Sequence, residues 1–248
     1  MLEQLELKLL GGYPIETSVG NMFQAKVKDI VEIDESTYNK YLSLLLYDVD
    51  LIEEKSIIEK QFGIGEFTTF EFLIMQSISS EEFKDIAINA LEFFLKQPVH
   101  LADKYGFFYI GDIENQKVIT SETYSYIRKI LIKMNYLKEM EEEEQLEFAN
   151  ETAREWYMNI KKLEREKPKI KPQVNLHSII SAMMWRTDKT VDEIFNMTVY
   201  QLYDGYYRLF LIDDCLGVKQ GIYAGTVDSD KVKPDDLNWA KIIQNEEN

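Results

Sequence analysis

The sequence predicts an α+β fold that is mainly α-helical, with N-terminal β-hairpin elements and helices followed by a compact C-terminal helical unit. Two observations support the fold class. Most apolar runs recur at helical spacing behind Ser, Thr or Asn caps, whereas residues alternate between apolar and polar only near the start and around 107–119. The 248 residues are 45% hydrophobic and 12% aromatic, which is enough to form sizeable cores.

The first elements are expected to be strands. Leu5, Leu7 and Leu9 alternate with charged residues, as on a strand with one buried face. The run Gly11-Gly-Tyr-Pro14 is typical of a turn. The same alternation within 23–31 predicts a second strand.

Helices are expected next. In the clearest of them, 80–96, Ser79 with Glu82 forms a capping-box pattern and Pro98 ends the helix. Apolar residues at helical spacing predict four helices, at 35–48, 66–78, 80–96 and 121–136.

A hairpin is expected between the last two of these helices, with strands at 107–110 and 117–119 around a turn at 111–115. Residues 142–166 then read as one long helix with a charged face. The Pro- and Lys-rich run 167–173 cannot continue it. We therefore expect an N-terminal α+β domain at 1–166, a linker at 167–173 and a small helical domain at 174–248.

The C-terminal unit is predicted from its caps. Asn175 can cap a helix that runs through Trp185. Two capping boxes follow, Thr190 with Glu193 and Thr198 with Gln201, the second before a helix from Val199 to Asp213. The glycines after that point predict an extended segment at 218–227 and a short final element around 237–243.

Charge narrows the function classes. The net charge of −16 and the pI of about 4.7 disfavour nucleic acid and anionic membranes as partners. The sequence shows one cysteine, no signal peptide and no apolar run long enough to cross a bilayer. We therefore expect a cytoplasmic protein.

No motif in the sequence points to catalysis, a cofactor or a metal. His100 and His177 lack ligand or base partners at defined spacing. Cys215 follows two aspartates at a predicted helix end, which disfavours the thiolate. The aspartates of the final segment do not follow the calcium-loop pattern; they are Asp228, Asp230, Asp235 and Asp236. The glycine pairs lack the context of a phosphate-binding loop. We therefore expect no enzyme.

An aromatic-rich stretch, Tyr200 to Phe210, is the strongest candidate for binding. Such residues could stack on bases, but on a helix half of them share one face, as in a core. Tyr200, Tyr207 and Arg208 point elsewhere, and these residue types anchor protein interfaces. With Trp185 they form the candidate protein-binding set. Gly205, within this helix, either permits close approach of another backbone or is simply tolerated.

Part of the chain resembles proteins encoded in tail-gene clusters of phages and prophages of Gram-positive bacteria, described as tail assembly chaperones or tail-region proteins. The resemblance covers about the last third of the chain. It is carried by Asn175-Leu-His-Ser-Ile-Ile-Ser-Ala-Met-Met-Trp185 and, most clearly, by Ile194-Phe-Asn-Met-Thr-Val-Tyr-Gln-Leu-Tyr-Asp204. The segment Asp34-Glu-Ser-Thr-Tyr-Asn-Lys-Tyr-Leu-Ser-Leu-Leu-Leu46 is also similar, more loosely.

The resemblance implies a non-catalytic chaperone in the bacterial host that coats the phage tape-measure protein and recruits tail-tube subunits. An apolar surface on an acidic scaffold suits such a holdase, and self-association is compatible with it. Two other functions stay open. One is a structural component of the tail or baseplate. The other is an acidic inhibitor of a host protein, for which 139–155 offers a dense run of carboxylates.

Overall fold

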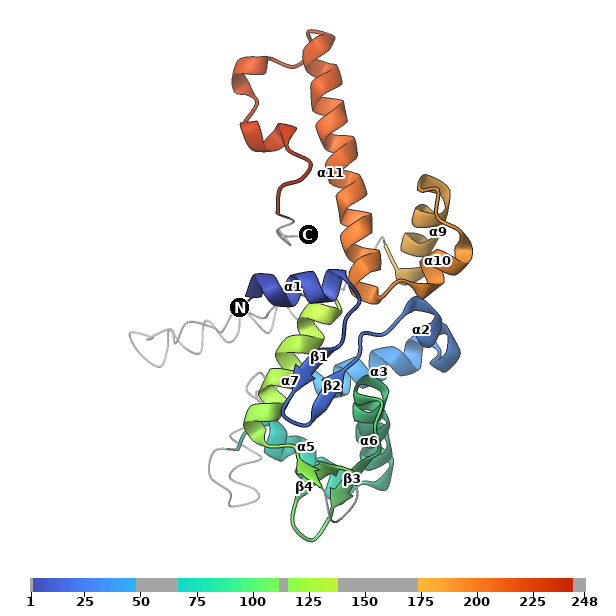
Figure 1. Cartoon of the computed structure of the whole chain (residues 1–248), viewed down its shortest axis with the longest axis vertical. Helices are drawn as coiled ribbons and strands as arrows, with labels where there is room; N and C mark the ends of the chain where they lie inside the picture. Colours follow the sequence, from blue (N-terminus) through green and yellow to red (C-terminus); the bar gives the residue numbers. More distant parts are fainter. Residues whose placement is uncertain (1, 48–66, 112–115, 138–173, 243–248) are drawn as a thin grey trace, which may run out of the picture.

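The computed structural model describes residues 2–47, 67–111, 116–137 and 174–242 (Figure 1). The fold is α+β and mainly helical, as predicted. The predicted helix 142–166 and the linker 167–173 lie outside the described residues. The elements are α1 (Leu2–Leu10), β1 (Ile15–Thr17), β2 (Gly20–Met22), α2 (Val27–Ile33), α3 (Glu35–Leu45), α5 (Thr69–Ser79), α6 (Glu81–Leu95), β3 (Val99–Ala102), β4 (Phe107–Ile110), β5 (Lys117–Val118), α7 (Ser121–Met134), α9 (Leu176–Arg186), α10 (Val191–Asn196), α11 (Val199–Tyr223), and the 3-10 turns η2 (Ser229–Lys231) and η3 (Pro234–Leu237).

The first predicted strand is wrong, because residues Leu2–Leu10 form helix α1. Leu5 and Leu9 pack against the core, whereas Leu7 is 69% exposed. A spacing of four residues places two side chains on one face of a helix as well as of a strand. The exposure of Leu7 distinguishes the two, and the sequence does not show it.

The second predicted strand, 23–31, is also wrong. The paired strand β2 ends at Met22 and helix α2 begins at Val27. The backbone N–H of Lys26 donates to the Asp29 carboxylate over 3.0 Å. Val27 and Ile30, three residues apart, are the buried positions of this helix. Capping by Asp29 thus favours a helix where the alternation indicated a strand.

The other predicted helices of this half are confirmed with small shifts, as α3, α5, α6 and α7. Both the cap and the first residue of helix α6 lie one residue later than predicted. Ser80, and not Ser79, accepts the Phe83 N–H, while the Ser79 hydroxyl donates to the Met75 carbonyl at the end of α5.

The predicted hairpin forms, and β4 pairs antiparallel with β5. A third strand, β3, was not predicted; it pairs with the other edge of β4 and includes His100. Strands β1 and β2 form a separate antiparallel ribbon. The large core lies among α3, α5, α6 and α7, where fully buried Leu91, Phe94 and Tyr124 pack together.

The C-terminal helices pack with Val27 of α2 in a second, smaller cluster, to which they contribute Ile179, Met183, Ile194 and Leu202. The predicted caps are confirmed at Asn175, Thr190 and Thr198. Helix α11, however, does not end at Asp213 but continues to Tyr223, so the predicted extended segment 218–227 is wrong in its first half.

Short backbone contacts join the C-terminal helices to the rest of the molecule. The Val27 N–H donates to the Met197 carbonyl and the Val199 N–H to the Ala25 carbonyl, over 3.0 and 2.9 Å. Lys26 and Thr198 therefore form an isolated antiparallel bridge. Beyond this bridge α11 extends away from the body of the molecule, and the following chain turns back along it (Figure 1).

Candidate protein-binding surface

Helix α11 holds most of the aromatic residues singled out from the sequence. Its first turn is closed by the Thr198–Gln201 box, and the Gln201 side chain donates to the Leu10 carbonyl of α1 over 2.9 Å. This contact fixes the direction in which α11 leaves the body. Val199 and Leu202 are buried at its base.

Tyr200 and Tyr207 are half-buried in a cluster of tyrosines. The ring of Tyr136, just after α7, stacks on Tyr207 at 5.5 Å between centroids and lies tilted against Tyr200 at 5.3 Å. Tyr136 also stacks on Tyr203 at 6.2 Å. Tyr136 adopts a left-handed backbone conformation, with φ of 57°. The tyrosine cluster thus joins the end of α7 to one face of α11.

Burial and nearby charge shift the pKa values of side chains in and beside this cluster. Burial, and then the nearby charge of Asp204, raises the pKa of Tyr200 to about 12. Burial also raises the pKa of the Asp204 carboxyl, although Arg208 partly offsets it. Burial therefore favours the neutral forms of Tyr200 and Asp204.

Arg208 makes contacts within the chain. Its guanidinium donates to the backbone carbonyls of Trp239 and Lys241, over 2.7 and 2.8 Å. Arg208 therefore lies beside the tyrosine cluster and also holds the segment that follows α11.

Trp185 lies at the end of α9 and is 88% exposed. Its neighbour Arg186 pairs with Asp213, which holds the end of α9 against the middle of α11. Gly205 lies where the two helices approach. A Cβ atom there would lie 3.1 Å from the terminal methyl of Met183, so Gly205 meets a side chain of α9 and not its backbone.

Other exposed side chains of this unit were not singled out from the sequence. Met184 precedes Trp185, Phe210 lies in the middle of α11 and Tyr223 at its end, and all three are exposed. Phe210 was expected in the core stripe. The unforeseen length of α11 explains the position of Tyr223. No local signal marks Tyr136, because its partners lie on a distant helix.

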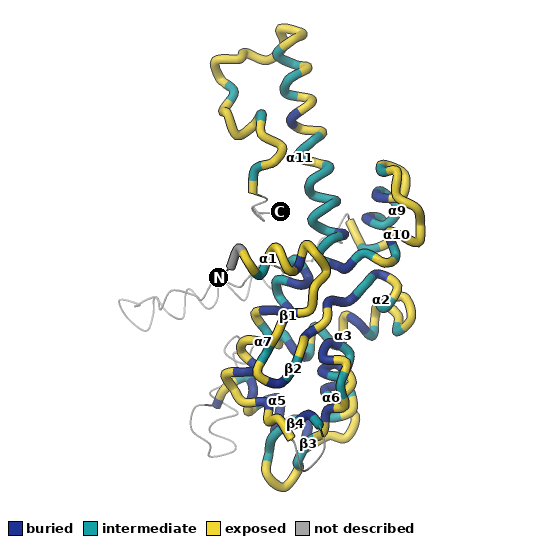
Figure 2. Tube along the Cα trace, viewed as in Figure 1, coloured by how far each residue is buried: buried dark blue, intermediate teal, exposed yellow. Residues whose placement is uncertain are grey.

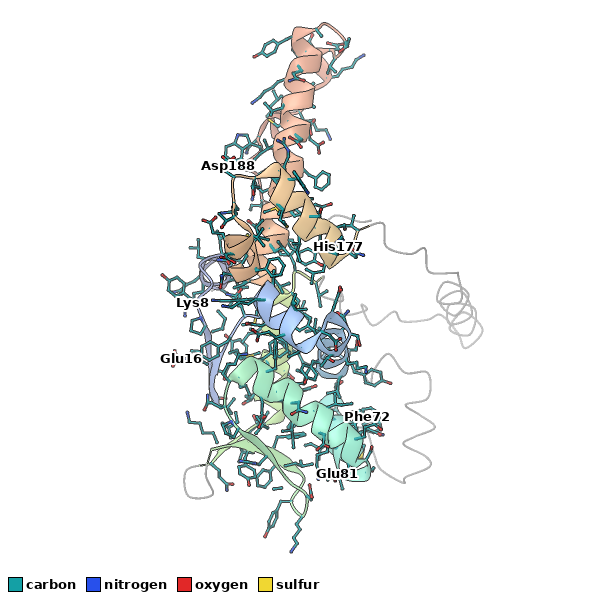
Figure 3. The ribbon with its side chains drawn as sticks, turned by 90° about the vertical axis from the view of Figure 1, so that its right-hand side faces the viewer. Lys8, Glu16, Phe72, Glu81, His177 and Asp188 are labelled. Carbon is teal, nitrogen blue, oxygen red and sulfur yellow. The ribbon has the colours of Figure 1, made fainter. Side chains whose placement is uncertain are left out.

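The remaining candidates are not brought together. His100 contacts the ring of Tyr109 on the sheet, whereas His177 lies exposed at the start of α9 (Figure 3). Cys215 lies inside α11 and not at a helix end, and it is buried. Among the described residues, no group of three or more His, Cys, Asp or Glu side chains is placed to hold a metal ion.

A cavity of about 740 Å³ lies between α3, α5 and α6. Its lining is mostly apolar, with Leu44, Phe72 and Phe83, and its polar residues are Ser36, Asn39, Lys40, Ser43, Thr69 and Gln76. The described lining contains no carboxylate, histidine or cysteine that could activate its serines. In the described part of the chain, no helix has the length and apolar character needed to cross a membrane.

Comparison with known proteins gives one match. Residues 166–244 match the model of a family described as YomV second domain. No curated protein and no solved structure matches the chain. The family match covers α9, α10 and α11, and it suggests a protein family of the phage or prophage type.

Proposed function

We propose that this protein is a non-catalytic tail assembly chaperone of a phage or prophage, acting in the host cytoplasm by binding the tape-measure protein and, through it, tail-tube subunits. The proposal rests on the resemblance of its last third to tail-region proteins and on the phage-type family match to the same residues. The observation that carries the binding function is the exposure of large apolar side chains on α9 and α11.

The chemistry of this surface suits a helical client. Trp185, Met184 and Phe210 offer large apolar contact area. An amphipathic or apolar helix binds such a surface through residues at helical spacing. The net charge of −16 keeps the resulting complex soluble.

Co-expression tests the proposal. The tape-measure protein of the same phage or prophage is expressed with and without this chain, and its soluble fraction and co-purification are measured. We expect soluble complex only when both are present. Trp185→Ala should lower the yield, whereas Tyr105→Ala should not, because Tyr105 is similarly exposed, at 79%, but lies on the β3–β4 turn.

A structural component of the tail or baseplate is the second candidate. It predicts that the protein remains in finished particles, whereas a chaperone is absent from them. Mass spectrometry of purified virions separates the two, and stoichiometric recovery of this chain from particles would overturn the chaperone proposal.

A further inference from the structure

The chain after α11 turns at Gly225, whose φ is +71°, and runs back along the helix (Figure 1). We call residues 228–242, which include η2 and η3, the strap. A Cβ atom at Gly221 would lie 2.6 Å from a methyl of Val227, so this glycine lets the returning chain approach α11 closely. The strap thus lies against one face of the extended half of α11.

That face carries a regular apolar seam, formed by Leu211, Cys215, Val218 and Ile222. Their alternating spacing of four and three residues is the pattern by which one helix packs against another. Cys215 is only 3% exposed and the other three are half-buried. A seam suited to a helix is therefore occupied by a strap that has only two 3-10 turns.

The strap is attached by few contacts. Two are the hydrogen bonds from Arg208 to the Trp239 and Lys241 carbonyls, and a third runs from the Cys215 thiol to the Leu237 carbonyl over 3.1 Å. Most strap side chains are exposed, and Ile242 is 83% exposed (Figure 2). Little apolar burial therefore holds the strap in place.

Charge and packing also weaken this contact. A cavity of about 450 Å³ lies between part of the strap and α11. Four aspartates line it, Asp213 and Asp214 from the helix and Asp235 and Asp236 from the strap, together with Lys241. Carboxylates that line one cavity repel each other, although Lys241 and the Arg186–Asp213 ion pair offset part of that repulsion.

We propose that the strap is a displaceable cover, and that the second occupant of the α11 seam is an amphipathic helix of a partner protein with apolar residues three and four positions apart. The strap and the partner helix compete for one face, so the strap sets how readily the partner binds. The identity of the partner rests on the proposed function; the opening of the strap does not.

Cys215, the single cysteine of the chain, reports this opening directly. Its labelling by a thiol reagent is measured in the full-length protein without denaturant and at low urea. Local opening predicts a rate that is insensitive to low urea. Arg208→Ala removes two of the three attachments and should accelerate labelling on the order of tenfold. Labelling only at the rate of global unfolding, with no effect of Arg208→Ala, would overturn the proposal.

Two further variants test whether the rate of Cys215 labelling follows the attachment of the strap. Asp235→Asn removes one repelling charge and should slow labelling by about twofold or more. Lys84→Ala removes a cation that pairs with Glu81 on α6, away from the strap, and should leave the rate unchanged. If Lys84→Ala accelerated labelling as Arg208→Ala does, the effect would be a general loss of stability, and the strap would not be its cause.

Binding of a tape-measure fragment separates the two proposals. If the strap competes with the fragment, Arg208→Ala should tighten binding by about the factor by which it accelerates labelling, and Asp235→Asn should weaken it. Accelerated labelling with unchanged or weaker binding by Arg208→Ala would contradict the competition. Absence of binding in every variant would refute the proposed function, while the labelling rates would still decide whether the strap opens.

Discussion

At the scale of single residues, Asp204 shows how burial shapes the tyrosine cluster. Its carboxyl lies half-buried beside Tyr200 and Tyr136, and burial raises its pKa above the usual 3.8. A raised carboxyl pKa means that the folded protein binds more protons than the unfolded chain within that pH window. The stability therefore falls as pH rises through the window, and the cost is fully present above it.

The substitution Asp204→Asn removes this cost and should stabilise the protein near pH 7. The gain should shrink as the pH falls and vanish well below 3.8, where the wild-type carboxyl is protonated in both states. Urea unfolding of the wild type and of Asp204→Asn, near pH 7 and at the acidic pH, measures this gain in unfolding free energy. Asp188→Asn, at an exposed position near the end of α9 (Figure 3), controls for the loss of one charge. A gain that does not depend on pH would contradict this account of Asp204.

At the scale of elements, local signals predicted the caps of α9, α10 and α11, because a cap is decided within four residues. Contacts between residues far apart in the sequence decide the features that were not predicted. Leu5 and Leu9 fit a strand or a helix equally well until α1 packs against α11. The glycines at 217 and 221 indicated the end of α11, yet both lie within it. The role of Arg208 depends on carbonyls more than thirty residues away along the chain.

Thr198 is the cap on which the position of α11 depends. Its hydroxyl accepts the Gln201 N–H over 3.2 Å, and it lies at the bridge to Lys26. Thr198→Ala should cost about 1 kcal/mol of unfolding free energy, within the range of roughly 0.5–2 kcal/mol for lost caps. Thr198→Ser keeps the cap and should retain most of that stability. Equal losses in the two variants, measured by urea unfolding, would show that the methyl group and not the cap matters.

At the scale of the whole molecule, a packed α+β body carries one long helix that extends from it (Figure 1). The two-residue bridge and the Gln201 contact orient that helix at its base. The exposed Trp185, Phe210 and Tyr223 all belong to this extended part and to the helix α9 packed on it. The sequence predicted the helical unit but not the reach of α11, because the glycines that indicated its end lie within it.

The affinity of the purified protein for a helical fragment of its tape-measure protein tests the central claim most directly. Isothermal titration calorimetry should give saturable binding that Trp185→Ala weakens by about tenfold or more, as expected for an interface anchor. Tyr105→Ala, which removes a similarly exposed aromatic side chain on the β3–β4 turn, should bind as the wild type does. No binding by the wild-type protein, or equal loss from both substitutions, would contradict a client surface on α9 and α11.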